Sequence, residues 1–380
     1  MIPLNKYILR EEKPATQFKT SSVKTTIPEF KRLDLAEAER IYMTDALVRN
    51  AINTSVQLFD CDYDIEAPTN KIKEEVEDFL DSIDFPQLRR DIARDAFVYG
   101  DAWCELVYKY NKLIGVVSLN PRTIDYQKTD MGAIKLDSYG NPVGYLQTVN
   151  TEQMLDPAVQ RRLVTIGGVT GIPLRNDQVA RFYFDKIGNG WYGLGLIEPI
   201  YSVTLGKNEA EMGLSHVIHK VGFPIIIMSV GDEDHQPTPD MIDSGLNMIR
   251  DLNYKTELSI PYYMKVDTLK VTRIEKLKEF LDYFIEQQIT GMGLPGAIAT
   301  GRGEDVNRST LVSQIKIFMK INDARRKLFA DQFNTQILAR LAKSRNWHRT
   351  PKIVPKPSDI ENILEGVQKD VKKDKTGEIG

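Results

Sequence analysis

The sequence predicts an α+β protein, with mixed short elements in its first half and long helices in its second. Before residue 190, apolar residues recur at helical spacing in some segments and alternate as in β-strands in others. Later, residues 196–220, 273–292 and 309–343 carry long helical patterns. A chain of 380 residues with 42% apolar side chains suits two or three folded units.

Residues 36–190 are predicted to form one α+β unit. Residues 36–58 read as a single helix, in which Thr44 and Asp45 are ordinary interior polar residues. Thr69 caps a helix that runs to about Ile83, and the helix after Pro86 ends at Gly100. The predicted strands are 60–67, 103–110, 113–119, 123–127, 133–136, 143–148, 163–166 and 179–184, with 103–119 folded as a hairpin that turns at 111–112.

The second half begins with the predicted helix 196–220, which Gly222 stops. A block of about fifty residues follows, with strands at 225–230, 262–265 and 269–271 and a helix at 240–253. Helix 273–292 has an apolar face wider than one partner helix would bury, so contacts with neighbouring subunits are expected. A glycine-rich loop at 291–307 then precedes the helix 309–343 and a polar tail with a short helix at 359–371.

Charge and cysteine content restrict the function classes. Fifty basic and 53 acidic side chains nearly cancel, so the net charge of −3 provides no general attraction to nucleic acid. Cys61 and Cys104 are too few for a disulfide scaffold or a cysteine-based zinc site, and a reducing, intracellular place of folding is expected. The N-terminus lacks a secretory pattern, and no run of 18 apolar residues predicts a membrane span.

The glycines after residue 187 match a dinucleotide-binding fingerprint by letters, Gly188-x-Gly190-x-x-Gly193. That fingerprint needs an acidic residue about 20 positions later, at the end of a second strand, but the position falls near Gly213 within a predicted helix. Trp191 and Tyr192 would also hinder the approach of a pyrophosphate. A strand-to-helix corner, whose glycines turn the chain, is the favoured interpretation, and a nucleotide-binding enzyme is the alternative.

Other chemical motifs are weak. His216 and His219 share a helix face but have no evident third metal ligand, and no serine-nucleophile motif is found. We therefore expect neither an enzyme nor a metal or cofactor site. Basic residues along the last helix could face a polyanion, as in a DNA-binding structural protein without a ring, or form an ordinary solvated face. They are Lys316, Lys320, Arg325, Arg326, Lys327, Arg340, Lys343 and Arg345.

The order of several passages resembles the portal proteins of tailed double-stranded DNA viruses over residues 36–345. The first passages are Asp95–Glu105, a helix followed by Tyr-Gly-Asp-Ala-Trp and a strand, and Leu119-Asn120-Pro121. The next runs from Asp177 to Phe184 and continues through Trp191–Pro199, but with Arg181 and Gly195 where the family commonly has His and Ser. Gly-Leu-Pro-Gly at 293–296, between two long helices, completes the series.

The resemblance implies a portal-type subunit and a ring, typically of twelve, around a channel through which double-stranded DNA is packaged and ejected at one capsid vertex. It implies a virion location, with assembly in the host cytoplasm. The implied divisions are an arm at 1–35, an α+β wing at 36–195, stem helices at 196–221 and 273–292, a small α/β clip at 222–272, a tunnel loop at 293–308, a tunnel helix at 309–345, and a small crown with a flexible tail at 346–380.

The resemblance also implies roles for particular residues and partners. The expected partners are the terminase large subunit, head-completion or adaptor proteins, and the major capsid and scaffolding proteins, with no membrane. Ala297, Thr300, Arg302, Glu304, Asp305 and Arg308 would line the DNA channel. Asp232, Glu233, Asp240, Arg250, Tyr254 and Lys255 would dock the terminase at the clip. Leu277, Phe280, Leu281, Phe284 and Ile285 would form the stem interface between subunits.

Overall fold

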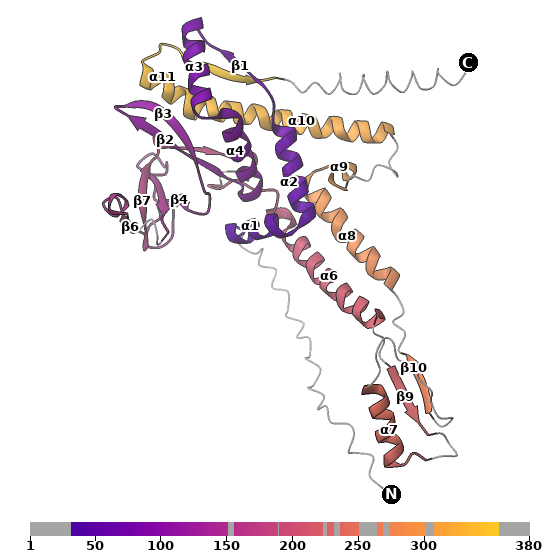
Figure 1. Cartoon of the computed structure of the whole chain (residues 1–380). Coiled ribbons are helices and arrows are strands. Elements are labelled where there is room, and N and C mark those ends of the chain that lie inside the picture. The colour runs from indigo at the N-terminus through magenta and orange to yellow at the C-terminus, as the bar shows by residue number, and fades with distance from the viewer. Residues whose placement is uncertain are drawn as a thin grey trace, which may run out of the picture. The chain divides into compact units, whose positions relative to one another are not determined.

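The computed structural model describes residues 32–150, 156–188, 190–222, 226–231, 236–250, 264–268, 274–300 and 308–356. The chain divides into Met1–Leu33 and Asp34–Gly380, and every described helix and strand belongs to the second unit (Figure 1). Helices and antiparallel sheets are mixed in this unit, which confirms the predicted α+β class.

The first predicted helix is two helices, α1 (Leu35–Thr44) and α2 (Ala46–Phe59). Asp45 separates them because its backbone is extended, with φ −88° and ψ 113°, and its carboxylate accepts hydrogen bonds from the amides of Leu47 and Val48. It is therefore the N-cap of α2, and its assignment as an ordinary interior polar residue was wrong.

The next two helices begin and end close to the predicted residues. Helix α3 (Asn70–Ser82) starts after Thr69, whose hydroxyl accepts a hydrogen bond from the Ile72 amide. Helix α4 (Phe85–Tyr99) has Pro86 in its first turn and ends at Gly100, where φ is 86°. Both capping predictions are confirmed.

Two antiparallel sheets follow, and the first of them packs against α3 and α4. The order is β3-β2-β8 in the first and β4-β5-β7-β6 in the second, and buried Trp103, Tyr126 and Leu174 belong to the core that they share. The hairpin turns at Tyr110-Asn111, one residue earlier than predicted. The strands are β2 (Ala102–Lys109), β3 (Lys112–Leu119), β4 (Ile124–Tyr126), β5 (Gly144–Thr148), β6 (Val164–Ile166), β7 (Val169–Arg175) and β8 (Val179–Phe182); β7 was not predicted, because Gly171 and Pro173 disrupt its apolar alternation.

The middle of the chain forms a helix pair with an inserted block. After the short 3-10 helix η3 (Glu198–Ile200), α6 (Tyr201–Gly222) packs against α8 (Ile274–Met292). The chain between them contains β9 (Ile226–Val230), α7 (Pro239–Arg250) and β10 (Met264–Thr268), and β9 pairs antiparallel with β10. Strand β10 overlaps the predicted strand at 262–265, whereas the predicted strand at 269–271 lies outside the described residues.

The C-terminal elements depart most from prediction. Helix α9 (Gly296–Thr300) occupies part of the segment predicted as loop, because Pro295 starts a helical turn that Ala-Ile-Ala continues. The long predicted helix consists of α10 (Arg308–Phe333), a π-helical segment η4 (Asn334–Leu338) and α11 (Ala339–Arg345). Strand β11 (Lys352–Pro355) pairs antiparallel with β1 (Tyr63–Glu66), so these four residues pack with the α+β unit, and the short helix predicted at 359–371 lies outside the described residues.

Candidate functional site

Three glycines bring the two main sequence passages into direct contact. A Cβ on Gly193 would lie 2.2 Å from the carbonyl oxygen of Gly100, and one on Gly195 would lie 2.7 Å from that of Val98. Gly188 turns the chain with φ 48°, but neither Gly193 nor Gly195 has a positive φ. The prediction that these glycines turn the chain is therefore wrong for Gly193 and Gly195, which instead permit backbone contact with the end of α4.

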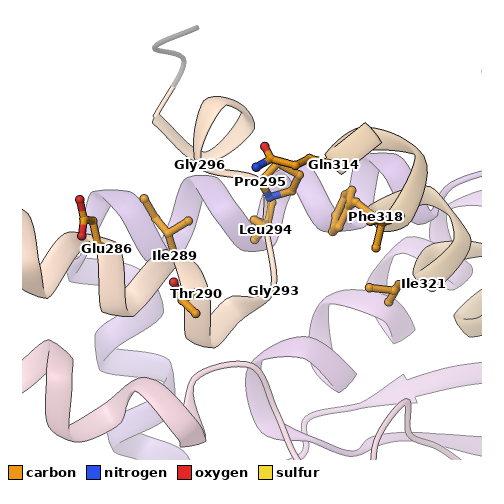
Figure 2. A pocket seen from close by; sticks show the side chains of 11 residues that line it. Glu286, Ile289, Thr290, Gly293, Leu294, Pro295, Gly296, Gln314, Phe318 and Ile321 are labelled. Atoms are coloured by element: carbon orange, nitrogen blue, oxygen red, sulfur yellow. The ribbon is translucent and has the colours of Figure 1, made fainter. Parts of the chain in front are cut away.

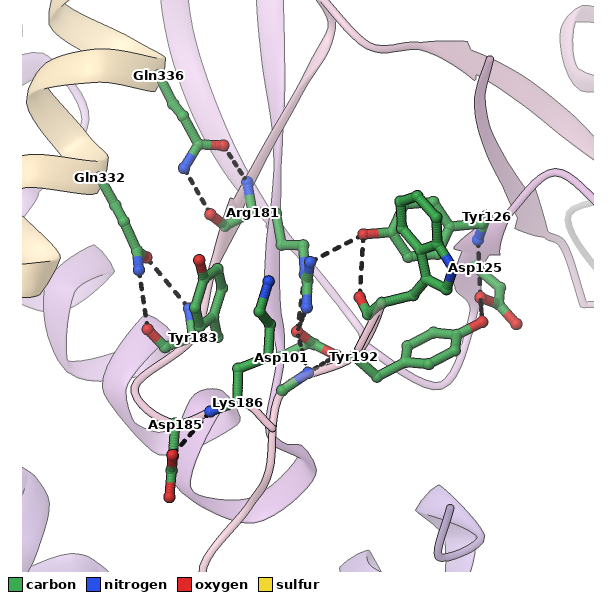
Figure 3. Close-up of polar contacts among 12 residues, drawn as sticks. Asp101, Asp125, Tyr126, Arg181, Tyr183, Asp185, Lys186, Tyr192, Gln332 and Gln336 are labelled. Atoms are coloured by element: carbon green, nitrogen blue, oxygen red, sulfur yellow. Dashed lines mark hydrogen bonds and ion pairs between the residues drawn. The ribbon is translucent and has the colours of Figure 1, made fainter. Parts of the chain in front are cut away.

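Asp101, directly after Gly100, holds this corner together (Figure 3). Its buried carboxylate accepts a hydrogen bond from the Gly193 amide at 3.1 Å and another from Nε of Arg181 at 2.8 Å. Arg181 also donates to the hydroxyl of Tyr126 at 2.9 Å, and that hydroxyl donates to the carbonyl of Trp191. The corner is thus a closed polar network that links α4, β8, β4 and the glycine segment.

The electrostatics of the corner favour a permanent ion pair. Burial opposes the charge on Arg181, but the Asp101 carboxylate outweighs that effect, so the pKa of the Arg181 guanidinium lies above its usual value. Burial raises the pKa of the Tyr126 phenol, which keeps it a neutral hydrogen-bond donor. Tyr192 adds a 2.6 Å hydrogen bond to Asp125. These groups therefore hold one another in a single geometry.

Side chains from the C-terminal helix cover the free edge of β8. Gln336 accepts from the Arg181 amide and donates to the Arg181 carbonyl, and Gln332 does the same at Tyr183 (Figure 3). Arg340 donates to the carbonyl of Val179. Four helical residues advance about 6 Å and two strand residues about 6.6 Å, so the two spacings match. The edge is therefore protected from pairing with another chain.

The π-helical segment η4 lies within this run of side chains. In an α-helix, residues four apart are offset by about 40° around the axis, so a row of three would drift away from a straight strand. The wider turns of η4, between Gln332 and Arg340, reduce that drift. The interruption of the long helix is thus what lets it follow β8.

A second buried polar cluster joins the helix pair α6/α8 to the rest of the unit. Nζ of Lys207 in α6 lies 2.8 Å from the carboxylate of Asp45, and both side chains are almost fully buried. Gln288 in α8 donates to that carboxylate and to the hydroxyl of Thr204. Burial opposes ionisation of Asp45, but the hydrogen bonds from Lys207 and the Val48 amide outweigh it, so the Asp45 pKa lies below its usual value.

The helix pair is packed between its two helices but exposes large apolar side chains on its outer surface. Phe284 packs against Gly206 of α6, where a Cβ would lie 3.0 Å from its ring. By contrast, Phe280 and Tyr283 of α8 are 60% and 55% exposed, and Met212 of α6 is 66% exposed. Large apolar side chains on a solvated helix indicate an unformed contact.

A groove of about 470 Å³ lies between the end of α8 and α10 (Figure 2). Buried Ile289, Leu294 and Phe318 lie along it, whereas Ile317 and Ile321 are exposed at its side. The groove therefore adds a second partly apolar surface, where the end of α8 meets α10.

The predicted site residues are only partly described. Phe280 is exposed, whereas Leu281, Phe284 and Ile285 are half-buried, and Leu277 lies in α8. Asp240 is exposed in the first turn of α7, and Arg250 ends that helix. Ala297 and Thr300 lie in α9, and Arg308 begins α10. Asp232, Glu233, Tyr254, Lys255, Arg302, Glu304 and Asp305 lie outside the described residues.

The predicted basic face of the last helix divides into two groups. Arg326 is buried and donates to the carbonyls of Leu58 and Phe59 at the end of α2, and the guanidinium of Arg325 lies over the Phe97 ring. Arg340 binds the edge of β8. These three arginines hold the fold, whereas Lys316, Lys320, Lys327, Lys343 and Arg345 are exposed.

The nucleotide-binding alternative does not fit the geometry. The Gly193 amide, which a pyrophosphate would need, already donates to the Asp101 carboxylate. The strands on either side, β8 and β9, belong to different antiparallel sheets, so no parallel βαβ unit surrounds the glycines. Across the described residues, no group of three His, Cys, Asp or Glu side chains could hold a metal ion, and no helix is long and apolar enough to cross a membrane.

Solved structures share this fold. A chain of the virion of a native gene transfer agent particle matches with a TM-score of 0.61 and 11% identity, over 93% of this chain and 91% of that one. A chain of the neck of the native particle, computed with C12 symmetry, matches with a TM-score of 0.59 and 11% identity over 90% of each. At these identities the similarity shows the fold alone. No curated protein sequence matched this chain.

The sequence itself matches one family along most of its length. The family is described as "Portal protein of Mu bacteriophage", and the match spans residues 36–376. It therefore includes the glycine corner, the α6/α8 pair with its inserted block, and the helix that covers β8. The resemblance found from the ordered passages is confirmed, and the chain belongs to the family of Mu bacteriophage portal proteins.

Proposed function

We propose that this protein is the subunit of a portal ring, a non-enzymatic conduit at one capsid vertex through which double-stranded DNA is packaged and ejected. The family match over residues 36–376 carries this proposal. The neck of a gene transfer agent particle, computed with C12 symmetry, contains a chain with the same fold, which supports a ring of twelve.

The surface of the helix pair supports assembly. Phe280, Tyr283 and Met212 remain exposed although the opposite faces of α6 and α8 are packed against each other. A ring needs a heterologous contact, in which one surface of a subunit meets a different surface of the next. Apolar side chains on both helices provide two such surfaces.

Within this proposal the segments keep the roles that the family resemblance implies. The pair α6 and α8 is the stem, the block 222–272 is the clip that docks the terminase large subunit and later the head-completion proteins, and 293–308 faces the DNA. Capsid and scaffolding proteins surround the ring during assembly in the host cytoplasm. A DNA-binding protein that does not assemble into a ring is the competing interpretation.

Ring assembly is tested by native mass spectrometry and negative-stain electron microscopy of the full chain. The wild type should form large rings with a central hole, and Tyr283→Glu should shift the protein to monomers because it places a charge in the stem contact. Tyr139→Glu is the matched control, since Tyr139 is 88% exposed in a loop of the wing, and rings should persist. A wild-type monomer at micromolar concentration would contradict the proposal.

The channel role of 293–308 is tested without deleting it. Ala299 is buried and its carbonyl accepts a hydrogen bond from Asn50, so a deletion through α9 would remove packed structure. We expect the triple substitution Arg302→Ser, Glu304→Ser and Asp305→Ser to leave rings intact and to reduce DNA packaging or retention in assembled particles. Loss of rings in this variant would contradict the loop assignment.

A further inference from the structure

A cationic surface remains outside the corner and the helix pair. Lys71 at the start of α3, Lys112 at the start of β3 and Arg345 at the end of α11 line one hollow of about 570 Å³. All three side chains are exposed. Both α3 and α11 pack against β3 (Figure 1), and each of the three segments contributes one cation to the hollow.

The charges of this surface are available to a partner. In the part of the chain that the structure describes, no ion pair involves Lys71, Lys112 or Arg345, whereas nearby Lys73 is paired with Glu77. Glu75 is the one carboxylate among the residues that line the hollow. Among the residues that line the hollow, three cations therefore outnumber one carboxylate, although the whole protein has a net charge of −3.

Flanking residues extend the surface on both sides. Residues 343–356 contain no acidic residue, and Lys343 and Arg349 are exposed there. Trp347 lines the hollow beside Arg345, and Tyr110 at the hairpin turn is 91% exposed, with Nζ of Lys109 6.0 Å from its ring centroid. Cations from several segments, interleaved with aromatic rings, are typical of surfaces that bind nucleic acid.

We propose that this cationic surface binds the phosphate backbone of duplex DNA on the outside of the subunit, independently of the channel. The surface has several flexible lysine ammonium groups and the guanidinium groups of Arg345 and Arg349, and its hollow is open to solvent. Such an arrangement suits repeated phosphates better than a single small anion. The binding would be independent of sequence and would weaken as salt is raised.

The test uses the full chain and a relaxed, covalently closed circular duplex, which cannot thread through a closed ring. Binding is followed by electrophoretic mobility shift over a range of salt concentrations. We expect Lys71→Gln/Lys112→Gln/Arg345→Gln to bind at least tenfold more weakly. The slope of log K against log salt should fall by about 2 to 3, near 0.9 for each lost phosphate contact.

The matched control removes the same charge elsewhere. Lys135, Arg161 and Arg162 are exposed and make no ion pair among the described residues, so Lys135→Gln/Arg161→Gln/Arg162→Gln should keep wild-type binding and slope. Equal loss in both triple variants, or an unchanged slope in the first, would overturn the proposal. Polyglutamate that competes as well as DNA at equal charge would assign the surface to an acidic protein and also overturn it. Electron microscopy of each variant reports ring assembly separately.

Discussion

The glycine corner and the outer surface of the α6/α8 pair contrast within one chain. At the corner, Asp101 is fully buried and its carboxylate is bound by Arg181 and by the Gly193 amide. On the helix pair, Phe280 and Tyr283 are more than half exposed. The corner is complete in a single subunit, whereas the helix pair has apolar surface left to bury. The corner thus needs no contact from outside the chain, whereas we propose that the α6/α8 pair is where subunits assemble.

The largest expected effect comes from breaking the corner at Gly193. Gly193→Ala should destabilise the protein by about 4 kcal/mol or more, because the new Cβ would lie 2.2 Å from the Gly100 carbonyl oxygen and neither backbone can move away cheaply. Denaturant unfolding of the full chain measures this. Gly213→Ala is the matched control in α6, where a Cβ meets nothing within 4 Å, and should be neutral or stabilising by up to about 1 kcal/mol.

The buried cluster where the two regions meet should give the next largest effect. Lys207→Met should cost about 3 to 5 kcal/mol in the free energy of unfolding, because it leaves the Asp45 carboxylate buried without its partner. Asp45→Asn removes the buried charge but keeps an N-cap for α2. The double variant Lys207→Met/Asp45→Asn should therefore be more stable than Lys207→Met alone. Strict additivity in this cycle would show that the pair is not coupled.

The same cluster predicts that the free energy of unfolding decreases at acid pH. The folded-state pKa of Asp45 is lowered, so its stabilising contribution is present above the unfolded-state pKa of about 3.9 and is lost as the pH falls through the lower folded value. Acid titration of the unfolding free energy should show this loss in the wild type. It should be absent in Asp45→Asn.

A smaller effect is expected where the C-terminal helix covers β8. Gln336→Ala leaves the amide and carbonyl of Arg181 without their side-chain partner and should cost about 1 to 3 kcal/mol. Thr335→Ala, one residue away, removes an exposed hydroxyl that bonds only to its own helix and should cost about 0.5 kcal/mol or less. Equal costs would show that the edge of β8 does not depend on Gln336.

A separate pH dependence is expected from Asp95 in α4. Burial and the neighbouring charge of Asp91 raise its pKa to about 7, so the folded state holds a proton that the unfolded state loses near pH 3.9. Wild-type stability should therefore fall as the pH rises from about 4 to 7. Asp95→Asn should remove this decline, which a shift of about three pKa units makes about 4 kcal/mol by pH 8. Asp91→Asn removes the neighbouring charge, so the pKa of Asp95 should be lower and the decline in stability should end at a lower pH.

The sequence alone determined the elements whose signals are local. Thr69, Pro86 and Gly100 each mark a helix boundary through a hydrogen bond or backbone angle within a few residues, and the structure has those boundaries. The ordered passages were enough to identify the family, because they keep their order and spacing along the chain.

Tertiary structure decided what depends on residues far apart in the chain. Gly193 is required because Gly100, 93 positions earlier, lies against it, and Asp45 meets Lys207 across 162 positions. Strand β11 exists because β1 pairs with it. Arg326 was predicted on an exposed basic face, but it is buried and caps the end of α2. Apolar periodicity records which face of an element is buried but not which segment buries it. For this reason, the partners of these residues could be known only from the folded chain.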